Sequence, residues 1–215
     1  MNNLILASNS PRRKELLSLL GFPFKITPAD ISEHHWFKEA PEDYVRRLAE
    51  EKASVIAEAQ EGVVIGADTI VVDGKGLLGK PEDPDDARRM LKQLRGRTHR
   101  VYTGIALLGS STGQPFSDVC CTNVPMRTYS DDEIDEYLKS GDPMDKAGAY
   151  AIQHADFHPV TDLKGCFASV MGLPLCHLAV GLKQLFFDIP SGLPDRCQRS
   201  LGYSCPIYQS ILGHE

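Results

Sequence analysis

The chain has no long hydrophobic run, and this absence sets a first limit on what it can be. None of its apolar stretches approaches the roughly 18 residues that cross a membrane. The N-terminus carries only a four-residue apolar run at residues 4–7 and no basic leader, so we expect no signal peptide. These absences lead us to expect a cytoplasmic protein with no membrane partner.

An excess of positive charge is also missing. Lysine and arginine number 23 against 29 aspartate and glutamate residues, which gives a formal net charge of -6. Nucleic-acid backbones are held by positive surfaces, so this balance argues against a nucleic-acid partner, although basic residues can still gather in one cleft. With 42% hydrophobic residues in 215, the chain can bury a real core, and we expect one domain over residues 1–190.

Cysteine and histidine form none of the usual metal or redox motifs. The six cysteines include no C-x-x-C pair, and reduced thiols are expected in a cytosolic chain. Adjacent side chains diverge, so we interpret His34 and His35 as solvated loop residues rather than metal ligands. Buried, inert thiols are predicted at Cys120, Cys121, Cys166 and Cys176.

Strand and helix signals alternate along the chain, which predicts an α/β protein with a mixed sheet. Strands are expected at residues 4–7, 24–27, 63–72, 101–108 and 119–128. Helices are expected to begin at Pro11, Pro41, Pro84, after the Ser130 capping box, and at Pro174, the last regular helix ending near Phe187. Glycines and prolines after about Ser191 predict an irregular C-terminal appendage at residues 191–215, to which we assign no function.

The first strand leads through a hydroxyl-rich turn into the first helix. Ser10 is placed as the N-cap and Pro11 at the first helical position. A helix N-terminus receives anions readily, and Arg12 and Arg13 add forked donors suited to phosphate oxygens. An ordinary capped helix with surface arginines is the alternative.

Asp68 and Lys52 are out of place among their neighbours. Asp68 interrupts the apolar run 63–72, where a buried carboxylate requires a metal, a lysine or a hydrogen-bond network, unless it reaches water at a strand end or bulge. Gly66 and Ala67 leave room beside it for a ligand or a second backbone. Lys52 falls on the apolar stripe of its helix, four residues from both Leu48 and Ile56. Its ammonium group either extends past the helix to solvent or points into a cleft.

A further lysine, Lys80, lies between Gly79 and Pro81 in a fixed, extended loop. This is weaker than a P-loop signature, because G-K-[ST] is absent. The candidate site as a whole contains an excess of cations around two acids, which indicates a polyphosphate site with a divalent cation held by the carboxylates. Its cations are Arg12, Arg13, Lys52 and Lys80, and its acids are Glu33 and Asp68.

Several motifs, in order from about residue 3 to residue 188, resemble those of the Maf family of nucleoside triphosphate pyrophosphatases. They lie at residues 7–13, 47–53, 66–69, 79–81, 145–153 and 170–174. The resemblance implies a two-lobed α/β fold similar to inosine-triphosphate pyrophosphatases, with the nucleotide in a cleft between the lobes. It also implies hydrolysis between the α- and β-phosphates, which gives a nucleoside monophosphate and pyrophosphate, and we expect a homodimer.

The resemblance carries roles onto particular residues. Asp68 matches the family's catalytic acid, described as the proton acceptor, and Glu33 matches an acidic position that would join Asp68 in holding Mg²⁺ or Mn²⁺. Ser8, Arg13, Lys52 and Lys80 match phosphate-handling positions. Arg12, Thr69 and Gln153 match three selectivity positions of the branch that acts on dTTP and UTP.

The chain departs from the family pattern in a few places. Ala168 and Ser169 stand where a serine-asparagine pair is more usual, and the loop 156–165 is an unusual version. Two other hypotheses stay open. One is a nucleotide-binding regulatory module of cell division without turnover, which would have no need of a costly carboxylate at Asp68. The other is the same reaction with another base preference, such as 7-methyl-GTP.

Overall fold

The computed structural model describes residues 3–74, 76–109 and 115–213. The sequence also predicts a turn at residues 74–76, of which Lys75 lies outside the described residues. The strands are β1 (Leu4–Leu6), β2 (Phe24–Ile26), β3 (Val63–Asp73), β4 (Gly76–Leu78), β5 (Thr98–Gly109) and β6 (Phe116–Pro125). The α-helices are α1 (Pro11–Ser18), α2 (Pro41–Ala57), α3 (Pro84–Leu94), α4 (Asp131–Lys139), α5 (Phe167–Met171), α6 (Leu175–Gln184), α7 (Leu193–Leu201) and α8 (Tyr208–Leu212). Two short 3-10 helices, η1 (Asp142–Asp145) and η2 (Ala147–Ala149), follow α4.

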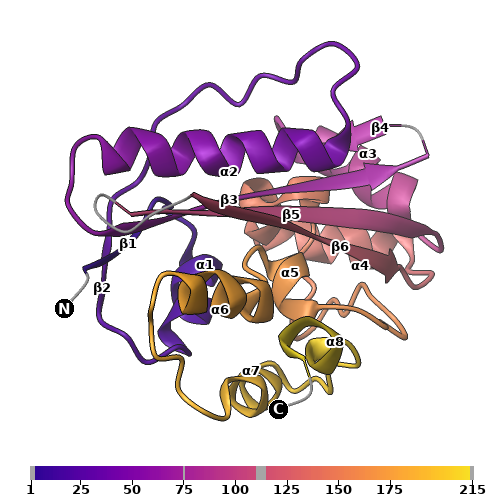
Figure 1. Ribbon diagram of the computed structural model, residues 1–215. Coiled ribbons are helices and arrows are strands. Elements are labelled where there is room, and N and C mark those ends of the chain that lie inside the picture. Colours follow the sequence, from indigo (N-terminus) through magenta and orange to yellow (C-terminus); the bar gives the residue numbers. More distant parts are fainter. Residues whose placement is uncertain (1–2, 75, 110–114, 214–215) are drawn as a thin grey trace.

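The strands form one mixed sheet, which confirms the predicted fold class. Its order is β2-β1-β3-β5-β6, with β4 also paired to β3. β1 runs parallel to β2 and β3, whereas β3, β5 and β6 are antiparallel neighbours. Helix α2 covers one face of the sheet, and α1, α5 and α6 lie against the other (Figure 1).

Strand β3 has two different partners along one edge, and they do not meet. β1 pairs with residues 63–65 of β3, and β4 pairs with residues 71–73. The other edge of β3 pairs with β5 over residues 63–72. Residues 66–70 therefore lie between the two partners of the first edge. We call this stretch the β3 edge gap.

Two glycines let α2 approach the sheet closely. A Cβ atom at Gly66 would lie 2.0 Å from the Ala49 carbonyl oxygen, and one at Gly104 would lie 2.3 Å from that of Val45. Only residues without a side chain permit such contact between a helix and a sheet. Of the two possibilities that the sequence leaves open at Gly66, the structure shows a second backbone, that of α2.

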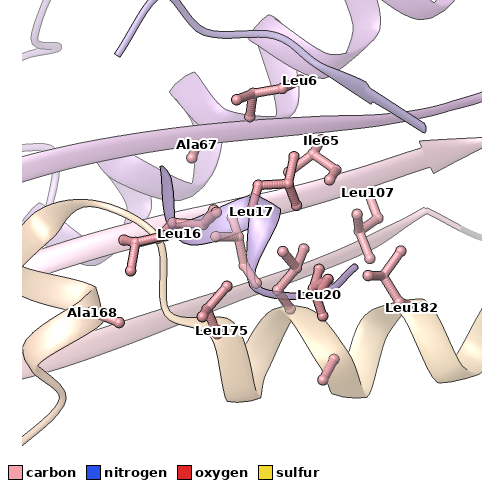
Figure 2. Packing of buried hydrophobic residues seen from close by; sticks show 14 of the residues in the cluster. Leu6, Leu16, Leu17, Leu20, Ile65, Ala67, Leu107, Ala168, Leu175 and Leu182 are labelled. Carbon is pink, nitrogen blue, oxygen red and sulfur yellow. The ribbon is translucent and has the colours of Figure 1, made fainter. Parts of the chain in front are cut away.

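Two hydrophobic clusters lie at opposite ends of β3. In the first, shown in Figure 2, Leu16 and Leu17 of α1 and Leu20 just after it meet α6 beneath the strands that carry Leu6 and Ile65. The second gathers Val71 of β3 with the apolar faces of α3 and α4. Ile65 and Val71 point to the same face of β3, because side chains on one face recur every second residue. These clusters form the two lobes expected of the fold, and the β3 edge gap lies between them.

Most predicted helix starts agree with the structure. Ser10 caps α1 with Pro11 at its first position, Asp83 caps α3, and Ser130 and Glu133 form a reciprocal capping box at α4. These local signals set helix boundaries because each satisfies backbone N–H groups that the helix leaves unpaired. In the described part of the chain, no helix is long and apolar enough to cross a membrane.

Three predictions about the rest of the chain are wrong. The segment after Ser191 is not irregular throughout, because it contains α7 and α8, and Leu193 is buried in the first cluster. Helix α6 is therefore not the last regular helix. Cys121 is exposed, whereas Cys120 is buried, because successive side chains of β6 point to opposite faces. The division of the chain at residue 190 stays a prediction.

Candidate active site

A cleft of about 390 Å³ lies along the β3 edge gap. It is bounded by the end of β1, the start of α1, the loop after β4 and the segment that follows η1. Every site residue named from the sequence lines this cleft, although they come from separate parts of the chain: Ser8, Arg12, Arg13, Glu33, Lys52, Asp68, Thr69, Lys80 and Gln153.

Asp68 and Lys52 form a buried ion pair at the centre of the cleft. Lys52 Nζ donates to Asp68 Oδ1 at 2.6 Å, and both residues are only 6% exposed. The same nitrogen donates to Glu33 Oε1 at 2.6 Å. Lys52 therefore points into the cleft rather than to solvent, and Asp68 is an interior residue of β3 rather than a strand end. The close packing of α2 on Gly66 brings Lys52 within reach.

The surroundings shift the pKa values of the two carboxyl groups, Asp68 and Glu33, in opposite directions. Burial raises the pKa of Asp68 above its ordinary value, although the charges of Lys52 and Arg13 act against this rise. Partial burial also favours the neutral form of Glu33, but the hydrogen bond and charge of Lys52, with the charges of Lys80 and Arg13, together hold the pKa of Glu33 below its ordinary value. The pKa of Asp68 is thus shifted toward its neutral form and that of Glu33 toward its ionised form.

Arg13 is fixed by three acceptors from three parts of the chain. Its Nε donates to the Gly172 carbonyl at 2.9 Å, Nη1 to Ser8 Oγ at 3.1 Å and Nη2 to Thr69 Oγ1 at 3.3 Å. Burial lowers the pKa of Arg13 from its ordinary value, and the charge of Asp68 opposes this change. A guanidinium held in this way presents a fixed positive charge beside the α1 N-terminus.

Thr69 connects Arg13 to the opposite wall. Its hydroxyl lies 3.0 Å from Thr103 Oγ1, which donates to the Ser169 carbonyl at 2.8 Å. Gly172, whose carbonyl accepts from Arg13, closes the short helix α5 that carries Ser169. The unusual pair at residues 168–169 is therefore buried behind the cleft.

Lys80 and Gln153 enter the cleft from segments that touch one another. The Gly148 N–H donates to the Gly79 carbonyl at 2.9 Å, which joins the loop of Lys80 to the segment leading to Gln153. Gly148 has φ +71, and a Cβ there would lie 3.0 Å from Val71 Cγ2. The glycine lets this segment pass close to β3.

Three further residues belong to the site but receive no role from the sequence. Asp145 Oδ2 accepts from Arg12 Nη1 at 3.1 Å, and Lys146 Nζ donates to Asp145 Oδ1 at 2.6 Å. Tyr44 of α2 donates its hydroxyl to the Glu33 carbonyl at 3.0 Å and so fixes the loop that carries Glu33. All three line the cleft. In the sequence, Asp145 and Lys146 fall within the motif at residues 145–153, and Lys146 precedes the small-residue run 147–149.

The donors of the cleft fit a divalent cation only in part. Glu33 and Asp68 meet at one ammonium group, so their oxygens lie close together. In the described part of the chain, no group of three or more histidine, cysteine, aspartate or glutamate residues is arranged to hold a metal. Two carboxylates are nevertheless the usual protein share of a Mg²⁺ site whose other ligands are phosphates and water. The residues therefore fit a cation that arrives with a phosphorylated substrate.

Fold and cleft together define the class: an α/β protein whose cation-rich cleft contains a buried ion pair and suits an anionic ligand. The chain belongs to the Maf family, because the family model described as Maf-like protein matches residues 3–185. The resemblance predicted from the sequence is thereby confirmed.

Curated relatives support the same assignment. The chain is similar to the dTTP/UTP pyrophosphatase of Hahella chejuensis, with 46% identity over 86% of this chain and 94% of the relative. The protein of the same name from Dehalococcoides mccartyi is 42% identical over 86% of this chain and 83% of its own length. That of Desulforamulus reducens is 42% identical over 88% of this chain and the whole of the relative.

Solved structures give a more distant likeness. The Ham1 protein of Staphylococcus aureus matches with a TM-score of 0.43 and 13% identity, over 58% of this chain and 71% of that protein. A Ham1 protein from Coxiella burnetii matches with a TM-score of 0.43 and 18% identity, over 59% of this chain and 73% of that protein. The family assignment rests on the sequence relatives and not on these matches.

Proposed function

We propose that this protein hydrolyses nucleoside triphosphates, dTTP and UTP in particular, to the nucleoside monophosphate and pyrophosphate. The observation that carries the proposal is the buried Asp68–Lys52 pair inside a cleft lined by further cations. A carboxylate in such a place is costly, and a purely binding module has no need of it. The activity is the one named in the curated relatives.

Phosphate binding falls to the cations and to the start of α1. Arg13 is held rigidly beside the α1 N-terminus, where unpaired N–H groups and the helix dipole favour an anion. Lys80 adds a charge from the opposite wall. These groups hold a triphosphate in line and stabilise the charge that develops as the α–β anhydride bond breaks.

Asp68 acts as the general base. Its pKa is raised by burial, so it takes a proton from water more readily than an ordinary aspartate does. Lys52 holds one carboxylate oxygen and leaves the other to face the water that attacks the α-phosphorus. After attack, Asp68 holds the proton and pyrophosphate leaves.

A divalent cation, Mg²⁺ or Mn²⁺, would be held by Glu33 and Asp68. When bound with the substrate it neutralises phosphate charge and polarises the phosphoryl oxygens. Glu33 suits this task because its lowered pKa keeps it ionised.

Gln153 is proposed to read the base. Its amide presents both a donor and an acceptor, as the carbonyl and N3–H of a pyrimidine require. Pairing of this amide with a base edge discriminates against bases with another edge. Arg12 and Thr69 act with it by seating the nucleotide. We also propose that the protein works as a homodimer in the cytoplasm.

Product analysis tests the reaction type. The protein is incubated with each nucleoside triphosphate and Mg²⁺ or Mn²⁺, and the products are separated by anion exchange. We expect monophosphate and pyrophosphate, fastest from dTTP or UTP. Orthophosphate and a diphosphate as first products would contradict the proposed reaction. Tight binding of nucleotides without turnover would favour the regulatory module, and a preference for 7-methyl-GTP would reassign the base.

A further inference from the structure

Arg12 is held across the mouth of the cleft by a residue far along the chain. Its Nη1 donates to Asp145 Oδ2 at 3.1 Å, which joins α1 to the end of η1. The Arg12 side chain is 20% exposed and that of Asp145 57%. This ion pair links the first lobe, which contains α1, to the second.

Asp145 is itself held by a buried lysine. Lys146 Nζ donates to Asp145 Oδ1 at 2.6 Å and to Asp142 Oδ1 at 2.8 Å, and its side chain is only 7% exposed. The Tyr137 hydroxyl donates to Asp142 Oδ2 at 2.7 Å and accepts from the Ala151 N–H at 2.9 Å. The carboxylate that holds Arg12 thus belongs to a network that ends two residues before Gln153.

Each oxygen of Asp145 has a different partner, one on each side of the cleft. This leaves the Arg12 guanidinium with one Nη1 contact, while its Nε and Nη2 donate to no atom in the described part of the chain. Arginine has many side-chain conformations, and fixing it in advance reduces the entropy lost when a ligand binds. The network therefore prepares Arg12 and the Gln153 segment together.

We propose that Asp145 is a positioning residue for nucleotide selectivity, which fixes Arg12 in register with the segment that carries Gln153. The inference rests on the proposed function, because it names a residue that acts at the same site. Asp145 contacts no reacting atom. It acts through Arg12, so its loss affects how the nucleotide is seated more than it affects the chemical step.

The test compares two aspartates in matched surroundings. Asp131 lies outside the cleft, binds Lys92 at 2.8 Å and Arg95 at 2.7 Å, and has a side chain 56% exposed. Asp145→Asn and Asp131→Asn each remove one charge from such a pair of contacts. For Asp145→Asn, we expect kcat/KM for UTP to fall relative to that for GTP by about tenfold, mainly through KM. Asp131→Asn should leave this ratio unchanged.

A double-mutant cycle isolates the action through Arg12. In an Arg12→Ala background, Asp145→Asn should cause no further change in the UTP-to-GTP ratio. An unchanged ratio in the single variant would overturn the inference, and so would an equal fall in both backgrounds. Asp145→Ala gives the same test if Asp145→Asn fails to fold. If the wild-type protein hydrolyses no nucleotide, the proposed function is overturned. If the enzyme is active but its selectivity does not depend on Asp145, only the inference about Asp145 is overturned.

Discussion

The ammonium nitrogen of Lys52 lies 2.6 Å from Asp68 Oδ1, between helix α2 and strand β3, which Gly66 allows to touch. The pair compensates a buried carboxylate that would be costly alone. It also leaves Asp68 more basic than an exposed aspartate, because burial raises its pKa despite the neighbouring cation. The chemistry we propose depends on this one contact.

Replacing Asp68 should abolish turnover with little effect on folding. Asp68→Asn keeps the shape and a hydrogen-bond acceptor for Lys52 but removes the base, so kcat should fall by about 10² or more. Steady-state kinetics with UTP and thermal unfolding of the same preparation measure the two effects. Nearly wild-type turnover in folded Asp68→Asn would move the role to another residue, Glu33 first.

The pH profile gives a second measure of Asp68. Only the ionised carboxylate can accept a proton, so kcat/KM should rise with pH through the pKa of Asp68, above the range of an exposed aspartate. The pKa of Glu33 is lowered, so its ionisation cannot account for this rise of kcat/KM with pH. A wild-type profile that stays flat down to the ordinary range of aspartate would contradict the assignment of Asp68 as base.

Phosphate binding and base recognition should separate by mutation. Arg13→Ala removes a cation that any triphosphate uses, so kcat/KM should fall by similar factors for UTP and for a purine triphosphate. Gln153→Ala should lower kcat/KM for UTP more than for the purine triphosphate, because a hydrogen bond to the base, worth about 0.5–1.5 kcal/mol, is lost. The two specificity constants of both variants check this. The reverse pattern would show that the roles of Arg13 and Gln153 are assigned wrongly.

Gly66 should tolerate no side chain. The Cβ of Gly66→Ala would meet the Ala49 carbonyl at 2.0 Å, so α2 must shift and carry Lys52 away from Asp68. We expect a loss of about 1–3 kcal/mol in unfolding free energy, together with reduced kcat. Gly74→Ala is the control, since its nearest atom would be Arg97 Nη2 at 4.0 Å. Equal effects of the two changes on stability would show that the close approach of α2 does not matter.

His99 should make the fold sensitive to mild acid. Burial lowers its pKa from 6.5 to about 4, and its Nε2 lies 2.8 Å from the Tyr150 hydroxyl. Between pH 6.5 and about 4, the unfolded chain therefore binds a proton at His99 that the folded protein does not bind. The contribution of neutral His99 to the free energy of unfolding, at most roughly 3 kcal/mol, is fully present above pH 6.5. It is lost as the pH falls toward 4.

Urea unfolding at several pH values measures the effect of His99. His99→Gln keeps a polar partner for Tyr150 but cannot titrate, so its stability should decline less between pH 6.5 and 4 than that of the wild type. Parallel declines in the two proteins would assign the acid sensitivity to other groups.

Local signals carried much of the fold. Proline and capping residues marked the starts of α1, α2, α3 and α4, because these signals act within one turn of helix. The apolar run around Asp68 predicted β3, because such a run is also a signal carried by neighbouring residues alone. β4 was not predicted, because a three-residue strand is too short to show a period. The helix α7 was missed because Gly192 and Pro194 punctuate its first turn in the manner of a loop.

The candidate site was predicted by type of residue and not by contact. Lys52 and Asp68 each violate an apolar pattern, and a violation can be recognised without knowing the partner. The sequence left open whether Lys52 reached solvent, since only the contact of α2 with Gly66 decides it. Asp145 and Arg12 are 133 positions apart, and Asp145 breaks no local pattern, so their pairing depends entirely on the tertiary fold.

The β3 edge gap has a consequence for solubility. A strand edge without a neighbouring strand is a template onto which a strand of another molecule can add, and inward-pointing charges are a common protection. Here β1 and β4 leave residues 66–70 between them, and the charges of Asp68, Lys52 and Arg13 gather at this opening. The residues that would handle phosphate therefore also guard the sheet against aggregation.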